Sequence, residues 1–261
     1  NIEGIAGILN GTTNFILTKM IEDGMTFEDA LKLAQDNGFA EKDPTADIEG
    51  FDACRKVCIL ASLAFGKHVY PNQVKAEGIT KITLEDVSYI SSVNGVIKLL
   101  GQIKKISDDK ITAFVSPAVV FNGSQLASVN GVFNSILVRG DAVGDVCFYG
   151  PGAGKLPTAS AVVADMVDCA IHVERRKNFG WGAGSEDYVA DEKAVLEMPF
   201  YVRAKASENA VMTAFNDVKF LSRKGQPSDE VAFITDSMTE NDLMSKLDGF
   251  NVINVIKVTN Y

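Results

Sequence analysis

Two kinds of hydrophobic periodicity alternate along the chain and separate predicted strands from predicted helices. Apolar residues at every second position, or in continuous runs, predict strands at 2–9, 96–106, 111–121, 132–141 and 142–150. Apolar residues spaced three or four apart predict helices at 12–23, 26–38, 51–65, 83–90 and 157–177. A polar turn at 107–110 separates two of the strands, which therefore form a hairpin, and the strands at 132–141 and 142–150 are expected to pair likewise.

Hydroxyl and glycine residues mark the expected ends of these helices. Thr12 or Thr13 is expected to cap the first helix, because a side-chain oxygen there satisfies a free backbone amide. Thr26 and Thr83 each stand three residues before an aspartate, which is the spacing of a capping box. Gly38 occupies the position of a helix stop, and three basic residues at 175–177 favour the end of the last helix.

The order of elements predicts an α+β fold, in which a mixed or antiparallel sheet carries helices on one face. Residues 179–197 are rich in glycine and charge and have weak periodicity, so we interpret them as a linker. Residues 198–261 then predict strand, helix, strand, strand, helix and strand, an order typical of a small two-layer domain. The sequence therefore predicts two domains, at 1–178 and 198–261, on either side of that linker.

Composition and charge narrow the classes of function. The 261 residues are 46% hydrophobic and carry a net charge of −9, which argues against binding to nucleic acid or an anionic membrane surface. No apolar run is long enough for a transmembrane helix, and no signal peptide is visible, so a cytoplasmic location is expected. Cys54 and Cys58 favour small buried thiols over a metal site, and no metal ligand is assigned. Because residue 1 is Asn, we expect the chain to be part of a longer protein.

A cluster of carboxylates directly precedes the apolar segment 51–65, which contains a lysine. Asp52 and Lys56 are four residues apart, so they share one face of the predicted helix. That helix is apolar nearly all round and is expected to be buried, which places Lys56 at the edge of the core or in a cleft. One interpretation is a structural ion pair. The other is a lysine that acts as general acid or base, or that holds a polar substrate.

Three further motifs leave their chemistry open. The carboxylates at 41–52 would suit a substrate with an ammonium group, and a Mg²⁺ site is the rival use, although no phosphate-binding loop is present. The segment "NGTTN" at 10–14 would bind a carboxylate at a helix N-terminus or would simply cap the helix. The segment "GPGAG" at 150–154 contains only part of a dinucleotide fingerprint and is not assigned as one.

Three long motifs, at this spacing, resemble the homoserine dehydrogenase family over residues 2–175. They are "GILNGTTNFIL", "GFAEKDPTADIEGFDACRKVCILA" and "LASVNGVFNSILVRGDAVGDVCFYGPGAGKLPTASAVVADMV". The resemblance implies interconversion of L-homoserine and L-aspartate 4-semialdehyde, on the route to threonine, methionine and isoleucine. It implies NADP or NAD as cofactor, bound mainly by an N-terminal Rossmann domain that this sequence does not contain. Without that domain, the fragment is expected to be inactive.

The resemblance also implies roles for individual residues. Lys56 would exchange a proton with the substrate oxygen, with Asp52 as its catalytic partner. Substrate-binding roles would fall to Glu41, which binds the amino group, and to Asp47, Thr12 and Gly11. The expected contacts with the nucleotide-binding part are Gly152, Ala153 and Gly154.

The predicted C-terminal domain is similar to an ACT domain in its order of elements. The usual Asp-x-Pro-Gly-Val-Leu after the first strand is missing, and "KASENAVMTAFNDV" stands there instead. Both a threonine-binding regulatory module and a purely structural ACT-like module therefore remain open. The family resemblance and exposed sheet surface further imply a homodimer. The alternative function is a non-catalytic module for amino-acid binding and dimerisation.

Overall fold

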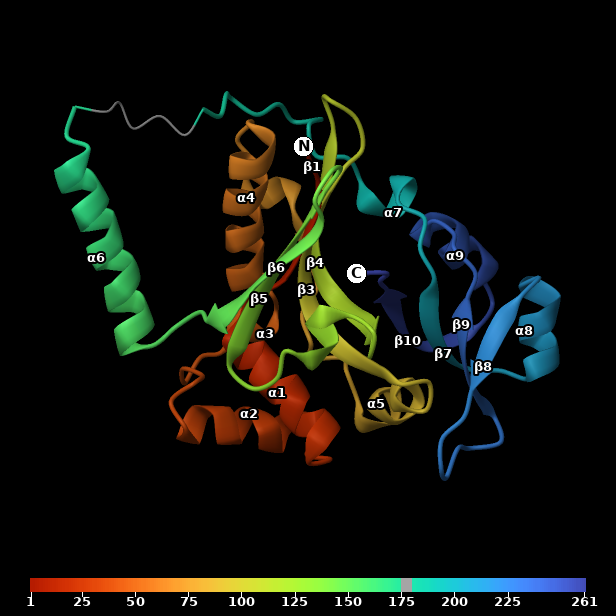
Figure 1. Cartoon of the computed structure of the whole chain (residues 1–261). Coiled ribbons are helices and arrows are strands. Elements are labelled where there is room, and N and C mark those ends of the chain that lie inside the picture. The colour runs from red at the N-terminus through yellow and green to blue at the C-terminus, as the bar shows by residue number, and fades with distance from the viewer. Residues whose placement is uncertain (175–179) are drawn as a thin grey trace.

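One mixed sheet connects the strands of the computed structural model, which describes residues 1–174 and 180–261 (Figure 1). The strands are β1 (Ile2–Ile8), β2 (Lys75–Ala76), β3 (Gly95–Lys105), β4 (Ile111–Phe121), β5 (Phe133–Gly140), β6 (Gly144–Pro151), β7 (Phe200–Lys205), β8 (Val218–Leu221), β9 (Glu230–Thr235) and β10 (Asn251–Val258). Their order in the sheet is β6-β5-β1-β3-β4-β10-β7-β9-β8, and β2 also pairs with β4. The sheet therefore runs without a break from the N-terminal part into the C-terminal part.

Helices cover the sheet unevenly. They are α1 (Gly11–Glu22), α2 (Phe27–Asp36), α3 (Thr45–Ile48), α4 (Phe51–Phe65), α5 (Leu84–Ser91), α6 (Lys155–Ile171), α7 (Glu192–Val195), α8 (Glu208–Ala214) and α9 (Glu240–Lys246). Ile97, Leu99 and Ile103 of β3 belong to the core beneath α1, α4 and α5. Leu100 points the other way, into a smaller core with the short 3₁₀ turn Gln125–Ser128. The larger core thus lies under the helices that carry the candidate site residues.

The predicted hairpins are confirmed. Strands β3 and β4 pair antiparallel from Lys105↔Ile111 outward, and β5 and β6 pair antiparallel up to Gly140↔Gly144. The capping box at the start of α5 is also confirmed, because Thr83 and Asp86 bond each other's backbone amides. The expected cap of α1 at Thr12 or Thr13 is wrong, since Asn10 occupies that position.

Helix α4 has the predicted bounds, Phe51–Phe65, but the expectation that it is buried nearly all round is wrong. One face packs on β3 and β4, whereas Phe51, Ile59 and Leu63 are about half exposed, at 46%, 55% and 49%. Helix α6 goes further, with no buried residue, and Figure 1 shows it standing apart from the sheet. The described part of the chain contains no helix with the length and hydropathy of a membrane span. The basic residues predicted to end α6, at 175–177, lie outside the described residues.

The C-terminal part has the predicted order of elements, β7-α8-β8-β9-α9-β10, around its own apolar core. It is not a separate sheet, because β10 runs parallel to β4 through Lys257↔Ala118 and Val258↔Val119. Within the described part of the expected linker, Tyr188 is only 2% exposed and Val189 pairs with Ile111, so this part is packed against the body of the molecule. The boundary proposed at 178/179 lies outside the described residues, and the division into domains stays a prediction.

A buried carboxylate fixes the C-terminal part against α5. Asp86 is fully buried and accepts hydrogen bonds from Tyr201 Oη at 3.0 Å and Asn254 Nδ2 at 2.9 Å. The Arg203 guanidinium lies 3.2 Å from the same carboxylate and compensates its charge. A buried charge is stable only with such partners, so the two parts depend on each other for this contact.

A second buried charge, Lys98 of β3, lies beside the junction between β1 and α1. Its side chain is 1% exposed, and its ammonium donates to Val129 O at 2.6 Å, Asn130 Oδ1 at 3.0 Å and Asn14 Oδ1 at 3.2 Å. All three acceptors are neutral, so burial lowers the pKa of Lys98 from 10.5 to about 8. Through these bonds Lys98 connects residues 129–130 to α1. The free-energy cost of burying its charge depends on pH.

The contribution of Lys98 to the unfolding free energy is expected to rise in alkali. Between about pH 8 and 10.5 the unfolded chain holds a proton that the folded chain has released, so unfolding takes up a proton. Relative to a Lys98→Met variant, the wild type should gain up to about 3 kcal/mol of unfolding free energy between pH 7 and 10.5. Urea denaturation at a series of pH values measures this difference, and a constant difference would contradict it.

Candidate active site

The side-chain amide of Asn10 lies at the centre of the candidate site, where it bonds both a helix end and two carboxylates. Asn10 follows β1 and caps α1, where its Oδ1 accepts a hydrogen bond from Thr13 N at 2.9 Å. Its Nδ2 donates to Asp47 Oδ1 at 2.7 Å and to Asp52 Oδ2 at 2.9 Å. Because one end of the amide is committed to the helix, the other end is fixed toward the two carboxylates.

Two short turns bring those carboxylates together. Asp47 lies on α3, which begins after Pro44, and Asp52 lies in the first turn of α4. Gly50 connects the two helices with a φ of 80°, a conformation that glycine adopts without strain. A side chain at this position would also meet Val115 at 3.3 Å. The sequence "DIEGFD" therefore folds so that both aspartates reach Asn10.

Lys56 completes the cluster one turn along α4. Its Nζ donates to Asp52 Oδ2 at 2.6 Å and to Leu9 O at 2.9 Å, so the predicted pairing with Asp52 is confirmed. The Lys56 side chain is 47% exposed, so it lies at the surface end of the cluster, in agreement with the expected position at the edge of the core or in a cleft. An ammonium has three donors, and among the described residues only these two acceptors bond it. The third N–H is left for another acceptor at the solvent-facing side.

A second asparagine brings two predicted glycines together. Asn134 of β5 donates to Ile8 O at 3.1 Å, at the end of β1. A Cβ added to Gly152 would lie 2.5 Å from Asn134 Oδ1, and one added to Gly11 would lie 3.6 Å from it. Gly11 also approaches Val132 O, at 2.8 Å from such a Cβ. The turn after β6 and the start of α1 are therefore adjacent, and both positions require glycine for close packing.

Other predicted site residues stand outside the hydrogen-bonded cluster. The Thr12 hydroxyl is committed to Phe39 O at 2.6 Å. Glu41 lies in the exposed loop after α2, where Gln35 bonds its backbone oxygen, and its carboxylate joins no cluster among the described residues. Ala153 and Gly154 lie in the turn that starts α6, and Gly154 is its N-cap without a side-chain hydrogen bond.

Sequence reasoning missed Asn10 and Asn134, the two residues that organise this region. A signal was present for Asn10, because "NGTTN" places it directly between an apolar strand and a helix start, where asparagine caps well. No such signal marked Asn134, which lies inside a predicted strand. Its partner Ile8 is distant in sequence and adjacent only through the pairing of β1 with β5.

Comparisons with known proteins show the family to which the chain belongs. The family model for homoserine dehydrogenase matches residues 1–167, and the chain belongs to that family. The homoserine dehydrogenase of Bacillus subtilis (strain 168) is 49% identical over 166 residues, which cover 64% of this chain and 38% of the relative. The chain thus spans less than half the length of that curated relative.

Solved structures extend the similarity beyond the family match. The crystal structure of Staphylococcus aureus homoserine dehydrogenase at pH 7.5 is 34% identical, with a TM-score of 0.84, and covers 100% of this chain and 66% of that one. A hyperthermophilic archaeal homoserine dehydrogenase mutant in complex with NADPH is 31% identical, with a TM-score of 0.55 over 66% of this chain and 48% of that one. The C-terminal part is thus included in the likeness to the Staphylococcus aureus structure.

Replacing Asn10 tests whether its amide holds the two aspartates together. Asn10→Ser keeps a helix cap but removes both amide donors, and Asn10→Asp keeps the cap while adding a third carboxylate. We expect a loss of about 2 kcal/mol of unfolding free energy for Asn10→Ser at pH 7, and a larger loss for Asn10→Asp. Equal unfolding free energies for all three proteins at pH 7 would rule out this role.

Proposed function

We propose that this chain carries the substrate site of an NAD(P)-dependent homoserine dehydrogenase, an oxidoreductase that interconverts L-homoserine and L-aspartate 4-semialdehyde. The observation that carries the proposal is the hydrogen-bonded set of Lys56, Asp52, Asn10 and Asp47. An ammonium fixed by two acceptors, with its third donor free, is suited to proton exchange with an alcohol or aldehyde oxygen. Family membership supports the same reaction.

Lys56 is the proposed acid and base. In the direction of reduction, its ammonium gives a proton to the aldehyde oxygen, which becomes the hydroxyl of homoserine. In the direction of oxidation, neutral Lys56 takes that proton back. Asp52 holds Nζ at 2.6 Å and is itself held by Asn10 at 2.9 Å, so the donor stays in place when its proton is transferred.

The charged groups of the amino-acid substrate would occupy the polar surface around this cluster. Glu41 lies in the exposed loop that precedes α3, where its free carboxylate is available for the substrate ammonium. The backbone at Gly11 and Thr12 begins α1 and favours the substrate carboxylate, because helix N-termini bind anions. Asp47 would shape the site by accepting a hydrogen bond from Asn10 Nδ2, the same nitrogen that bonds Asp52.

The turn at residues 152–154 is the proposed contact with the cofactor. When bound, the reduced cofactor NAD(P)H would supply the hydride to the aldehyde carbon, and the oxidised form NAD(P)⁺ would accept it from the alcohol carbon. The residues present fit a phosphate-bearing group, because α6 starts without a side-chain cap or an acidic residue in its first turn. Gly152 and Ala153 form the preceding turn, beside Asn134 and Gly11. A hyperthermophilic archaeal relative has been solved in complex with NADPH, which supports NAD(P) as the cofactor.

Exposed apolar surface suggests that the working enzyme contains further protein. Helix α6 exposes Leu156, Met166 and Ile171 by 65% or more, which suits a contact with a nucleotide-binding domain. We propose that the chain needs such a domain for turnover. We also propose a homodimer through the helix-free face of β5 and β6, where Phe133 and Tyr149 stack at 5.1 Å. A cytoplasmic location fits its four free cysteines.

The C-terminal part is proposed to be ACT-like because its order of elements is βαββαβ. Threonine is the effector that such a module would bind in this family. The structural alternative is favoured by the Asp86 contacts, which tie β7 and β10 firmly to α5.

Kinetics of the full-length enzyme test the role of Lys56. We expect Lys56→Ala to lower kcat for homoserine oxidation by about 100-fold or more, since positioned proton transfer contributes on that scale. KM for homoserine should change much less, because the substrate's charged ends are held elsewhere. Steady-state assays of NAD(P)H formation measure both constants.

Two further variants make the kinetic test specific. Asp52→Asn should also lower kcat, because it removes the charge that holds the ammonium. Lys205→Ala removes an exposed lysine of the C-terminal part, which pairs with Asp229, and should leave both constants unchanged. An unaltered kcat in Lys56→Ala would refute the acid–base assignment.

Sedimentation analysis tests the proposed dimer. Tyr149→Lys places a charge on the helix-free face and should shift the full-length protein toward monomer, because burying an unpaired charge in an interface is unfavourable. Phe148→Lys is a matched control, since this neighbour is similarly exposed but points to the opposite face of β6. A wild-type protein that sediments as a monomer at tens of micromolar would contradict the dimer.

A further inference from the structure

A network of buried hydrogen bonds connects α1 with the segment at 129–134, which leads from the 3₁₀ turn into β5. Asn14 lies one turn into α1 and is buried, and its Oδ1 accepts a hydrogen bond from Lys98 Nζ at 3.2 Å. Its Nδ2 donates to three backbone oxygens of that segment, Val129 O at 3.0 Å, Gly131 O at 3.0 Å and Phe133 O at 3.2 Å. Because Asn14 and Lys98 together bond the segment at several points, its conformation is fixed relative to α1.

The same segment packs against the candidate active site. A Cβ added to Gly11 would lie 2.8 Å from Val132 O, so the backbone that begins α1 is in direct contact with the segment. Asn134, two residues further along, is in similarly close contact with Gly152, in the turn that precedes α6. A displacement of the segment would therefore move both the surface proposed for the substrate carboxylate and the surface proposed for the cofactor.

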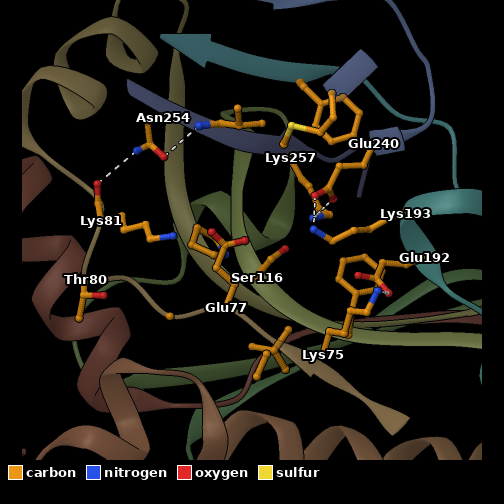
Figure 2. Close-up of a pocket in the computed structure, with 18 of the residues that line it drawn as sticks. Lys75, Glu77, Thr80, Lys81, Ser116, Glu192, Lys193, Glu240, Asn254 and Lys257 are labelled. Atoms are coloured by element: carbon orange, nitrogen blue, oxygen red, sulfur yellow. Dashed lines mark hydrogen bonds and ion pairs between the residues drawn. The ribbon is translucent and has the colours of Figure 1, made fainter. Parts of the chain in front are cut away.

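Lys98 brings a positive charge into this network, and all its bonded acceptors are neutral oxygens. Lys257, the other buried lysine in the described part of the chain, differs because its Nζ bonds the Glu240 carboxylate at 2.7 Å, which Lys193 also bonds (Figure 2). These two lysines line a cavity of about 680 Å³ beside Ser116, in the gap that β2 and β10 leave along β4. A buried charge without a bonded counter-ion is unfavourable, so the charge of Lys98 favours an anion bound nearby.

We propose that Lys98 is a positioning residue for substrate binding, because its buried ammonium fixes the start of α1 and favours the substrate carboxylate that binds there. The assignment rests on the proposed function, in which that carboxylate lies against the backbone of Gly11 and Thr12. Lys98 is itself buried, so it acts on the substrate through the 129–134 segment and through Asn14, which lies one helical turn from Gly11. Its effect is on binding, whereas that of Lys56 is on proton transfer.

The charge of Lys98 changes at moderately alkaline pH. Burial lowers the pKa of Lys98 from 10.5 to about 8, and the negative charge of Glu22 on α1 partly opposes this shift. Glu22 Oε1 accepts a hydrogen bond from Asn130 Nδ2 at 2.8 Å, next to the lysine. The other described groups that bond Lys98 or pair with it are neutral, namely Asn14, the Val129 carbonyl and Ala118 of β4. As the pH rises through about 8, Lys98 becomes neutral, and the preference for an anion at the start of α1 is lost.

Kinetics and calorimetry of the full-length enzyme at pH 7 test this role. We expect Lys98→Met to raise KM and Kd for homoserine by about tenfold and to change kcat by less than about twofold, because only binding loses a favourable charge. 3-Aminopropanol, which is homoserine without its carboxylate, should inhibit the wild type and Lys98→Met with the same Ki. Lys205→Met, which removes an exposed lysine of the C-terminal part, should leave all these constants unchanged.

The dependence on pH separates the charge of Lys98 from its packing. The ratio of KM in Lys98→Met to KM in the wild type should fall at least about threefold between pH 7 and about pH 9.5, because the wild-type lysine loses its proton. Titration of Lys56 and of the substrate amine affects both proteins alike and cancels in this ratio. Glu22→Gln keeps the oxygen that bonds Asn130 but removes the charge, so KM should begin to rise at lower pH than in the wild type. Glu22 is exposed, so this variant is decisive even if Lys98→Met does not fold.

The outcomes distinguish this role from the proposed function. An equal Kd for homoserine in the wild type and Lys98→Met, or an equal loss of affinity for homoserine and 3-aminopropanol, would refute the role of Lys98 and leave the proposed function intact. An unchanged KM profile in Glu22→Gln would also count against it. A wild-type enzyme that neither binds nor oxidises homoserine would refute the proposed function, and the role of Lys98 with it.

Discussion

The arrangement of the candidate site depends on one side-chain amide that serves a helix and two carboxylates at once. Asn10 Oδ1 is fixed by the first turn of α1, so its Nδ2 must face Asp47 and Asp52. Without donors between them, two carboxylates so close would repel each other. Lys56 then bonds the same Asp52 oxygen that Asn10 bonds. The orientation of Lys56 therefore follows from a series of contacts that begins at the cap of α1.

A second constraint is the shared use of β4 by two distant segments. Strands β2 and β10 attach to the same edge, and β10 brings the C-terminal part with it. Asp86 reinforces this junction through Tyr201, Asn254 and Arg203, so the contact is polar as well as apolar. The cavity with its paired lysines follows directly, because neither strand extends over Ser116.

Local patterns predicted what depends on neighbours in sequence. The two hairpins, the bounds of α4 and the Asp52–Lys56 pair involve periodicity, turn residues or i,i+4 spacing, and the structure contains all of them. Burial of α4 was predicted wrongly, because apolar residues such as Ile59 and Leu63 do not reveal whether their partner belongs to the same chain. Asn134 and the gap beside Ser116 arise from strand pairing between distant segments, which no local pattern encodes.

Chemical rescue of the full-length Lys56→Ala enzyme tests the central claim most directly, which is that the Lys56 ammonium exchanges the proton. Ethylamine is small enough to enter the space that the side chain leaves beside Asp52. We predict that it restores homoserine oxidation by at least about tenfold, whereas sodium chloride of equal ionic strength does not. A rate that does not respond to ethylamine, in a folded variant that still binds homoserine, would contradict the account.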